Sequence, residues 1–94
     1  MKISKKKRDK ISEQILLFLY SVAPKPIFTA HIADEIARDE EFIKKLLLEL
    51  ENKKLIVKIT KNSKGIKYLK RARWRLRDQV FQTYKHHQIN TKQY

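Results

Sequence analysis

Lysine and arginine are the side chains of this sequence whose number and grouping suit one chemistry, the binding of phosphate. They outnumber the acidic side chains by 23 to 10, so the 94-residue chain has a formal net charge of +13. An excess of this size on a small chain is typical of proteins that bind nucleic acid. An anionic membrane surface or an acidic protein is the second kind of partner that the charge would suit.

The basic residues gather in two segments of the chain. Residues 1–10 contain six basic residues and one acid, and residues 53–77 contain eleven basic residues and no acid. Residues 28–52, which lie between them, are acidic but include the basic pair Lys44 and Lys45. Phosphate contacts are therefore predicted from both basic segments and from this pair. The candidate residues are Lys5, Lys6, Lys7, Arg8, Lys44, Lys45, Lys61, Lys64, Lys67, Arg71, Arg73 and Arg75.

Side-chain patterns for catalysis or metal binding are missing from the sequence. There is no cysteine, which excludes disulfides, thiolate zinc sites and cysteine nucleophiles. His31, His86 and His87 have no metal-ligand spacing and no carboxylate cluster beside them, so we expect them on the surface. The chain has no glycine-rich phosphate loop and no nucleophile with a base partner. We predict a non-enzymatic protein without a metal or cofactor.

The length and the apolar residues predict one small domain. A hydrophobic fraction of 41% is enough for a modest core. The longest apolar run, residues 15–20, is shorter than a membrane span or the core of a signal peptide. We therefore expect an intracellular protein that does not enter a membrane.

The first helix is predicted between Asp9, its cap, and about Val22. Its apolar residues cover more than one face, so this helix must be covered on two sides. Pro24 and Pro26 end it and force an extended link through residues 27–28. The apolar residues are Ile11, Ile15, Leu16, Leu17, Phe18, Leu19, Tyr20 and Val22.

Two further helices are predicted before residue 54. Thr29 suits the cap of a short helix over residues 30–37, and Asp39 suits the cap of a helix over about 40–53. The second of these has carboxylates in its first turn, at the positive end of the helix dipole. Its core stripe at helical spacing is Ile43, Leu46, Leu47 and Leu50.

From residue 55 the apolar residues recur at every second position. Residues 55–60 are predicted to form a strand, 61–65 a turn and 66–77 a second antiparallel strand with one apolar and one basic face. A helix is the alternative for 66–77, because apolar residues there also recur at helical spacing. Asp78 suits the cap of a final helix over about 79–88.

This order of elements resembles the winged-helix family of DNA-binding domains. The resemblance rests on residues 32–36 (IADEI), 43–56 (IKKLLLELENKKLI) and 74–76 (WRL). It implies a winged helix-turn-helix fold, mainly α with a small two-stranded antiparallel β wing. The third helix would be the recognition helix. The chain would then divide into a basic N-terminal arm (1–8), the winged-helix domain (9–88) and a polar C-terminal tail (89–94).

The resemblance implies a DNA-binding protein, either a transcriptional regulator or a small chromatin-like factor. Its partner would be duplex DNA, held at the phosphates mainly by the basic wing and the arm. Two features depart from the family. Ala37 and Arg38 stand where the family usually has a glycine and an apolar residue, and carboxylates at 39–41 stand where recognition helices usually contact bases. The alternative is therefore an interaction module that binds RNA or an acidic protein.

Several candidate residues have an alternative role. Lys45 could pair with Glu41 and Glu49 on its own helix instead of binding phosphate. The cluster at 5–8 could be a solubilising tail instead of a phosphate-binding arm. Trp74 and Tyr68 share the apolar parity of their strand, so we expect them in the core and not as base-stacking platforms.

The first and last helices are predicted to form a homodimer. Apolar residues overfill one face of the first helix, and the last helix offers a stripe to match it. The alternative is that the last helix folds back on its own chain and covers that surface. The stripe consists of Val80, Phe81 and Tyr84.

Overall fold

The computed structural model describes residues 3–60 and 72–92, and the side chains of 3–60 and 72–87. Within these ranges four helices and three short strands follow one another along the chain. No described helix is long and apolar enough to cross a membrane. The elements are α1 (Lys5–Val22), β1 (Ile27–Phe28), α2 (Thr29–Ile36), α3 (Glu40–Asn52), β2 (Ile56–Ile59), β3 (Arg73–Leu76) and α4 (Asp78–Lys92).

Helix α1 begins five residues earlier than the sequence suggested. Its N-cap is Ser4, whose Oγ accepts a hydrogen bond from the backbone N–H of Lys7 at 3.2 Å. The expected cap at Asp9 is therefore wrong, because an equally good capping residue stands upstream and no helix-breaking residue separates the two. Residues 5–8 consequently form the first turn of α1 and are not an extended arm.

Helix α2 begins at Thr29 without a side-chain cap, so the predicted role of Thr29 as a cap is wrong. Its hydroxyl accepts a hydrogen bond from the indole N–H of Trp74 at 2.8 Å, which ties α2 to β3. The helix ends at Ala37, in the left-handed conformation at φ 61° and ψ 47°. The N–H of Arg38 donates to the carbonyl of Ala33 at 3.0 Å. Alanine tolerates this conformation at a cost of about 1 kcal/mol, which glycine would avoid.

Helix α3 agrees with the prediction at its start and along its buried face. The Asp39 carboxylate accepts a hydrogen bond from the N–H of Phe42 at 3.2 Å, so the predicted cap is confirmed. The predicted apolar stripe is also confirmed as buried. It consists of Ile43, Leu46, Leu47 and Leu50.

The sheet has three antiparallel strands in the order β1-β3-β2, where two were expected. The additional strand is the link after the prolines, in which Ile27 pairs with Trp74 and Phe28 with Arg73. Two residues are too few to show a period of two, so sequence pattern could not find this strand. Residues 73–76 pair with β2 as predicted, and the helical alternative is wrong for them. The predicted turn and residues 66–71 lie outside the described residues.

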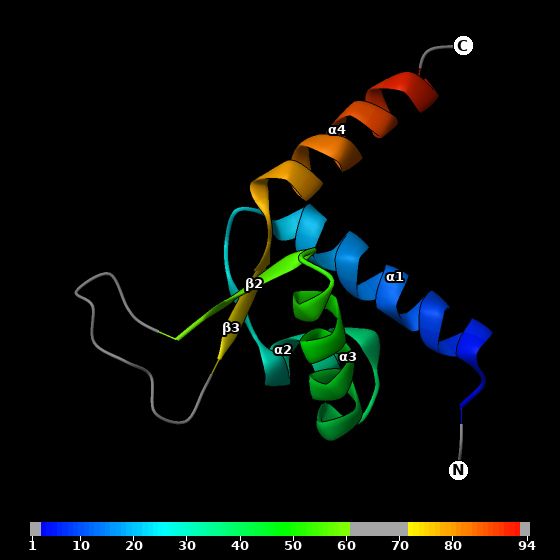
Figure 1. Ribbon diagram of the computed structural model, residues 1–94, viewed down its shortest axis with the longest axis vertical. Helices are drawn as coiled ribbons and strands as arrows, with labels where there is room; N and C mark the ends of the chain where they lie inside the picture. Colours follow the sequence, from blue (N-terminus) through cyan, green and yellow to red (C-terminus); the bar gives the residue numbers. More distant parts are fainter. Residues whose placement is uncertain (1–2, 61–71, 93–94) are drawn as a thin grey trace.

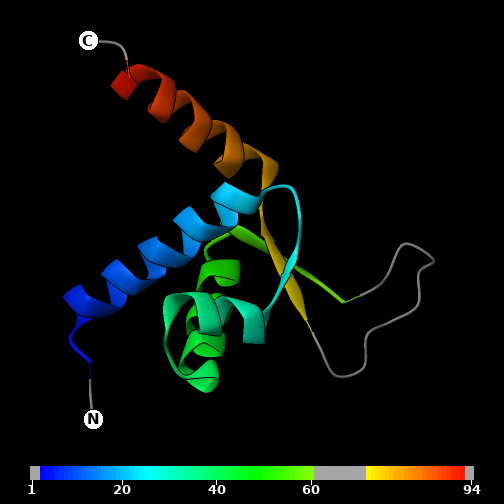
Figure 2. The ribbon, with the colours of Figure 1, turned by 180° about the vertical axis from the view of Figure 1, so that it is seen from behind.

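The core lies between α1, α2, α3 and one face of the sheet. Figure 1 shows these three helices gathered on one side of the strands, and Figure 2 shows the same arrangement from behind. Trp74 is 1% exposed, so its predicted place in the core is confirmed. The fully buried side chains around it are Ile15, Leu19, Ile32, Ile43, Leu46, Leu47 and Ile56.

The described α4 side chains that pack against the core, Val80, Phe81 and Tyr84, lie in the first half of the helix. The ring centroid of Tyr20 on α1 lies 5.2 Å from that of Phe81 and 5.7 Å from that of Tyr84. The last helix therefore folds back on its own chain here, as the alternative proposed. It also continues to Lys92, so residues 89–92 are helical where a tail was expected. The far end of α4 points away from the other helices (Figures 1 and 2).

The hydroxyl of Tyr84 joins α4 to α1 by donating a hydrogen bond to Oε1 of Glu13 at 3.0 Å. Partial burial, the hydrogen bond and the charge of Glu13 together raise the pKa of Tyr84 from 10.0 to about 12. A pKa that is higher in the folded chain means that the folded state binds this proton more tightly than the unfolded state. The contribution is therefore present below pH 10 and is lost as the pH rises to about 12.

We expect the free energy of unfolding to fall between pH 10 and pH 12 more steeply in the wild type than in Tyr84→Phe. The variant keeps the ring contacts with Tyr20 but has no phenol proton to lose. Urea unfolding at pH 9, 11 and 12, followed by Trp74 fluorescence, measures the difference. Equal slopes in both proteins would show that the Tyr84–Glu13 bond makes no pH-dependent contribution.

Candidate nucleic-acid interface

The first turn of α1 presents lysines to solvent. Lys5, Lys6 and Lys7 are exposed, whereas the half-buried Arg8 forms an ion pair with Glu49 on α3. Cations at the N-terminus of a helix are slightly unfavourable, because the helix dipole is positive there. The helix dipole therefore does not stabilise the charges of these three lysines, and a bound anion would reduce the repulsion between them.

Lys44 and Lys45 are exposed on α3. They share that helix and its cap with five carboxylates, so the outer surface of α3 is negative in a positive chain. The alternative role of Lys45 was an ion pair with Glu41 and Glu49 on its own helix. In the structure, Glu49 forms its ion pair with Arg8 and not with Lys45. The carboxylates are Asp39, Glu40, Glu41, Glu49 and Glu51.

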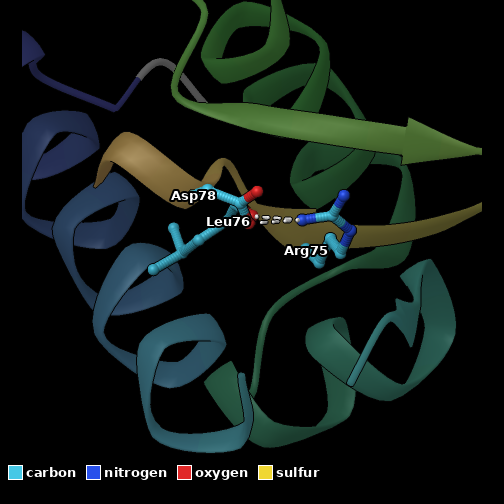
Figure 3. Close-up of polar contacts among 3 residues, drawn as sticks. All are labelled: Arg75, Leu76 and Asp78. Carbon is cyan, nitrogen blue, oxygen red and sulfur yellow. Dashed lines mark hydrogen bonds and ion pairs between the residues drawn. The ribbon is translucent and has the colours of Figure 1, made fainter. Parts of the chain in front are cut away.

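Arg73 and Arg75 lie on the face of the sheet opposite the core, and both are half-buried. The guanidinium of Arg75 donates to the carbonyl of Leu76 at 3.1 Å and lies 3.4 Å from the carboxylate of Asp78 (Figure 3). Arg73 lies over the Phe28 ring at 5.8 Å from its centroid. Both arginines thus have contacts within the chain, and Arg75 joins the end of β3 to the start of α4.

The candidate residues do not form one cluster in the described structure. The first turn of α1 meets α3 through the Arg8–Glu49 pair, but the strands lie on the other side of α3 from that turn (Figures 1 and 2). Lys61, Lys64, Lys67 and Arg71 lie outside the described residues, so their role stays a prediction. Any ligand that touched both the first turn of α1 and the strands would have to extend across the domain.

Three further exposed lysines were not among the candidates, although they belong to the basic run at 53–77. Lys53 and Lys54 follow α3, and Lys58 lies on β2. The ammonium of Lys58 is 5.8 Å from the centroid of the Trp74 ring, its partner across the strands. The lysines predicted from the sequence to bind phosphate follow the first strand of the wing. The structure shows that this strand also exposes a lysine of its own, Lys58.

Comparison with known proteins identifies the fold. No protein-family model and no curated protein sequence matches the chain. Among solved structures, the Zα domain of Carassius auratus PKZ in complex with Z-DNA matches at 20% identity and a TM-score of 0.59, over 76% of this chain and 98% of that one. Staphylococcus aureus MepR, in a complex with DNA, matches at 19% identity and a TM-score of 0.69, over 94% and 72%.

The chain has a winged helix-turn-helix fold. In this winged helix α2 and α3 form the helix-turn-helix, and β2 and β3 are the strands of the wing. Lactococcus lactis ZitR is also similar, at 18% identity and a TM-score of 0.67 over 93% of this chain. The winged helix spans 61% of the length of ZitR.

Proposed function

We propose that this winged helix binds duplex DNA, without catalysis, as a transcriptional regulator or small chromatin-like factor inside the cell. The observation that carries the proposal is the net charge of +13 on a fold of this type. Two proteins of similar fold, MepR and the Zα domain, have been crystallised with DNA. The charge supplies what phosphate binding requires, and the fold supplies a rigid support for it.

We propose that phosphates, more than bases, are the main points of contact. The lysines in the first turn of α1 are exposed. Among the described residues, none of these lysines forms an ion pair with a carboxylate. The first turn of α3 would instead bring Glu40 and Glu41 towards the phosphates if it entered the major groove. Phosphate contacts position a protein but carry no sequence information. Binding should therefore be strong at low salt and only weakly dependent on sequence.

A gel-shift panel tests the proposal directly. It compares right-handed duplex DNA, a left-handed duplex, single-stranded DNA and structured RNA at equal length and equal salt. Duplex DNA should bind more tightly than the single strands and the RNA. No shift with any duplex at low salt would refute the proposal.

The alternative is an interaction module for RNA or an acidic protein. The carboxylates along α3 favour it, because they disfavour the usual approach of this helix to DNA. Tighter binding of RNA than of duplex DNA in the same panel would support this alternative. The same panel can include an acidic polypeptide as a competitor. If the polypeptide displaces no DNA, this result argues against an acidic protein as the partner.

We further propose that the outer half of α4 packs against a second copy to form a dimer. Helix α4 has 15 residues, and its side chains packed against the core, Val80, Phe81 and Tyr84, lie in its first half. An isolated helix of this length is marginal in water, so a contact with a second copy would stabilise its outer turns. One chain has a mass of 11.4 kDa, and sedimentation at micromolar concentration should give twice this mass. A strict monomer would show that α4 is sufficiently supported by its own chain.

A further inference from the structure

Two large apolar side chains are strongly exposed among the described residues, and the fold explains neither of them. Leu17 on α1 is 44% exposed and Leu48 on α3 is 42% exposed. Each lies on a stripe of exposed residues at positions i, i+4, i+7 and i+11 of its helix. The stripe on α1 is Lys10, Gln14, Leu17 and Ser21, and the stripe on α3 is Glu41, Lys45, Leu48 and Asn52.

The two stripes match in length and in the position of their leucine, and their first residues, Lys10 and Glu41, carry opposite charges. Lys10 precedes Leu17 by seven residues, and Glu41 precedes Leu48 by the same number, which is about 10.5 Å on either helix. If the helices lie parallel, the two leucines meet while the ammonium of Lys10 faces the carboxylate of Glu41. An antiparallel arrangement that keeps the two leucines together would place Lys10 beyond Asn52, at the end of α3, and away from Glu41. The chemistry therefore favours one register and one direction.

We propose that the α1 stripe of one copy docks on the α3 stripe of a second copy. The Arg8–Glu49 ion pair shows that cations of α1 and carboxylates of α3 already pair within one chain. Leu48 and Asn52 also line a shallow depression of about 630 Å³ at the end of α3, which leaves space beside the stripe. The contact uses no residue of α4 and is separate from the proposed dimer.

The docked surfaces differ from each other, so the contact can repeat from copy to copy. Copies of charge +13 repel one another in free solution, and DNA phosphates would offset that repulsion. The proposed contact between copies therefore rests on the proposed function, because DNA binding brings the copies together. It also gives Glu41, in the acidic first turn of α3, a use, which is to bind Lys10 of a neighbour on the same DNA.

Charge exchange tests the contact. On a duplex long enough for several copies, the wild type should bind cooperatively, with a second copy bound about tenfold more tightly beside the first. Lys10→Glu and Glu41→Lys should each abolish this factor, because both place like charges opposite each other. The double variant should restore it at an unchanged net charge of +13. A duplex that holds one copy reports the proposed function alone, and the double variant should bind it like the wild type.

Cross-linking tests the same contact without DNA. The chain has no cysteine, so Leu17→Cys and Leu48→Cys chains can be mixed at high concentration and oxidised. A disulfide between the two kinds of chain is expected, and Leu17→Cys mixed with Glu35→Cys is the matched control. Non-cooperative binding together with no specific cross-link would overturn the contact, as would a double variant that fails to regain cooperativity. Loss of binding to the short duplex with the cross-link intact would refute the proposed function and leave the contact standing.

Discussion

The affinity of this winged helix for duplex DNA is expected to fall by about 100- to 10,000-fold as the salt concentration rises from about 50 to 200 mM. Each phosphate that a lysine or arginine neutralises releases condensed counterions, and the release is worth less as salt rises. If the protein covers about 4–8 phosphates, the logarithm of the association constant should fall with the logarithm of salt at a slope of roughly −4 to −7.

Fluorescence anisotropy on one duplex at five or more salt concentrations measures that slope. A second duplex of scrambled sequence is the control, and its slope should be nearly the same because phosphates are common to both. A slope close to zero would mean that contacts other than phosphate hold the complex. In that case the net charge of +13 would serve solubility and not DNA binding.

The parts of the fold that depend on neighbouring residues could be predicted from the sequence. The Asp39 cap and the buried stripe of α3 follow from spacing within one helix, and both are confirmed. Strand β3 likewise follows from the alternation around Trp74. These features need only local geometry, since a helix or a strand repeats its own period.

The remaining parts depend on contacts between distant segments. Strand β1 exists because Ile27 and Phe28 pair with residues more than 40 positions away. Thr29 is the first residue of α2 and not its cap, and its hydroxyl accepts a hydrogen bond from the distant indole of Trp74. In the candidate site, the pair between Arg8 and Glu49 links residues 41 apart. No local pattern announces such pairs, so the sequence could list the cations but not their partners.

Substitution of two wing lysines should weaken DNA binding more than substitution of the two lysines on α3. We expect Lys64→Ala with Lys67→Ala to lower the affinity roughly 50-fold at 0.1 M salt and to reduce the salt slope by about 2, if each lysine holds one phosphate. Both lysines lie in the basic run and outside the described residues. All DNA sequences should be affected alike, because phosphate contacts carry no sequence information.

Lys44→Ala with Lys45→Ala is the matched control, because it removes the same two charges from exposed positions. We expect less than about a fivefold loss of affinity from this pair. The Lys44 and Lys45 ammonium groups share their helix with Glu40 and Glu41, whose carboxylates repel the phosphates that a lysine would otherwise hold. The salt slope should change by clearly less than 1.

If the α3 pair instead lowers the affinity more than the wing pair, and also relaxes the preference for one sequence, then α3 reads bases in the major groove. Glu41 lies on the same exposed stripe as Lys45, so the proposed contact between copies would then compete with DNA for that helix face.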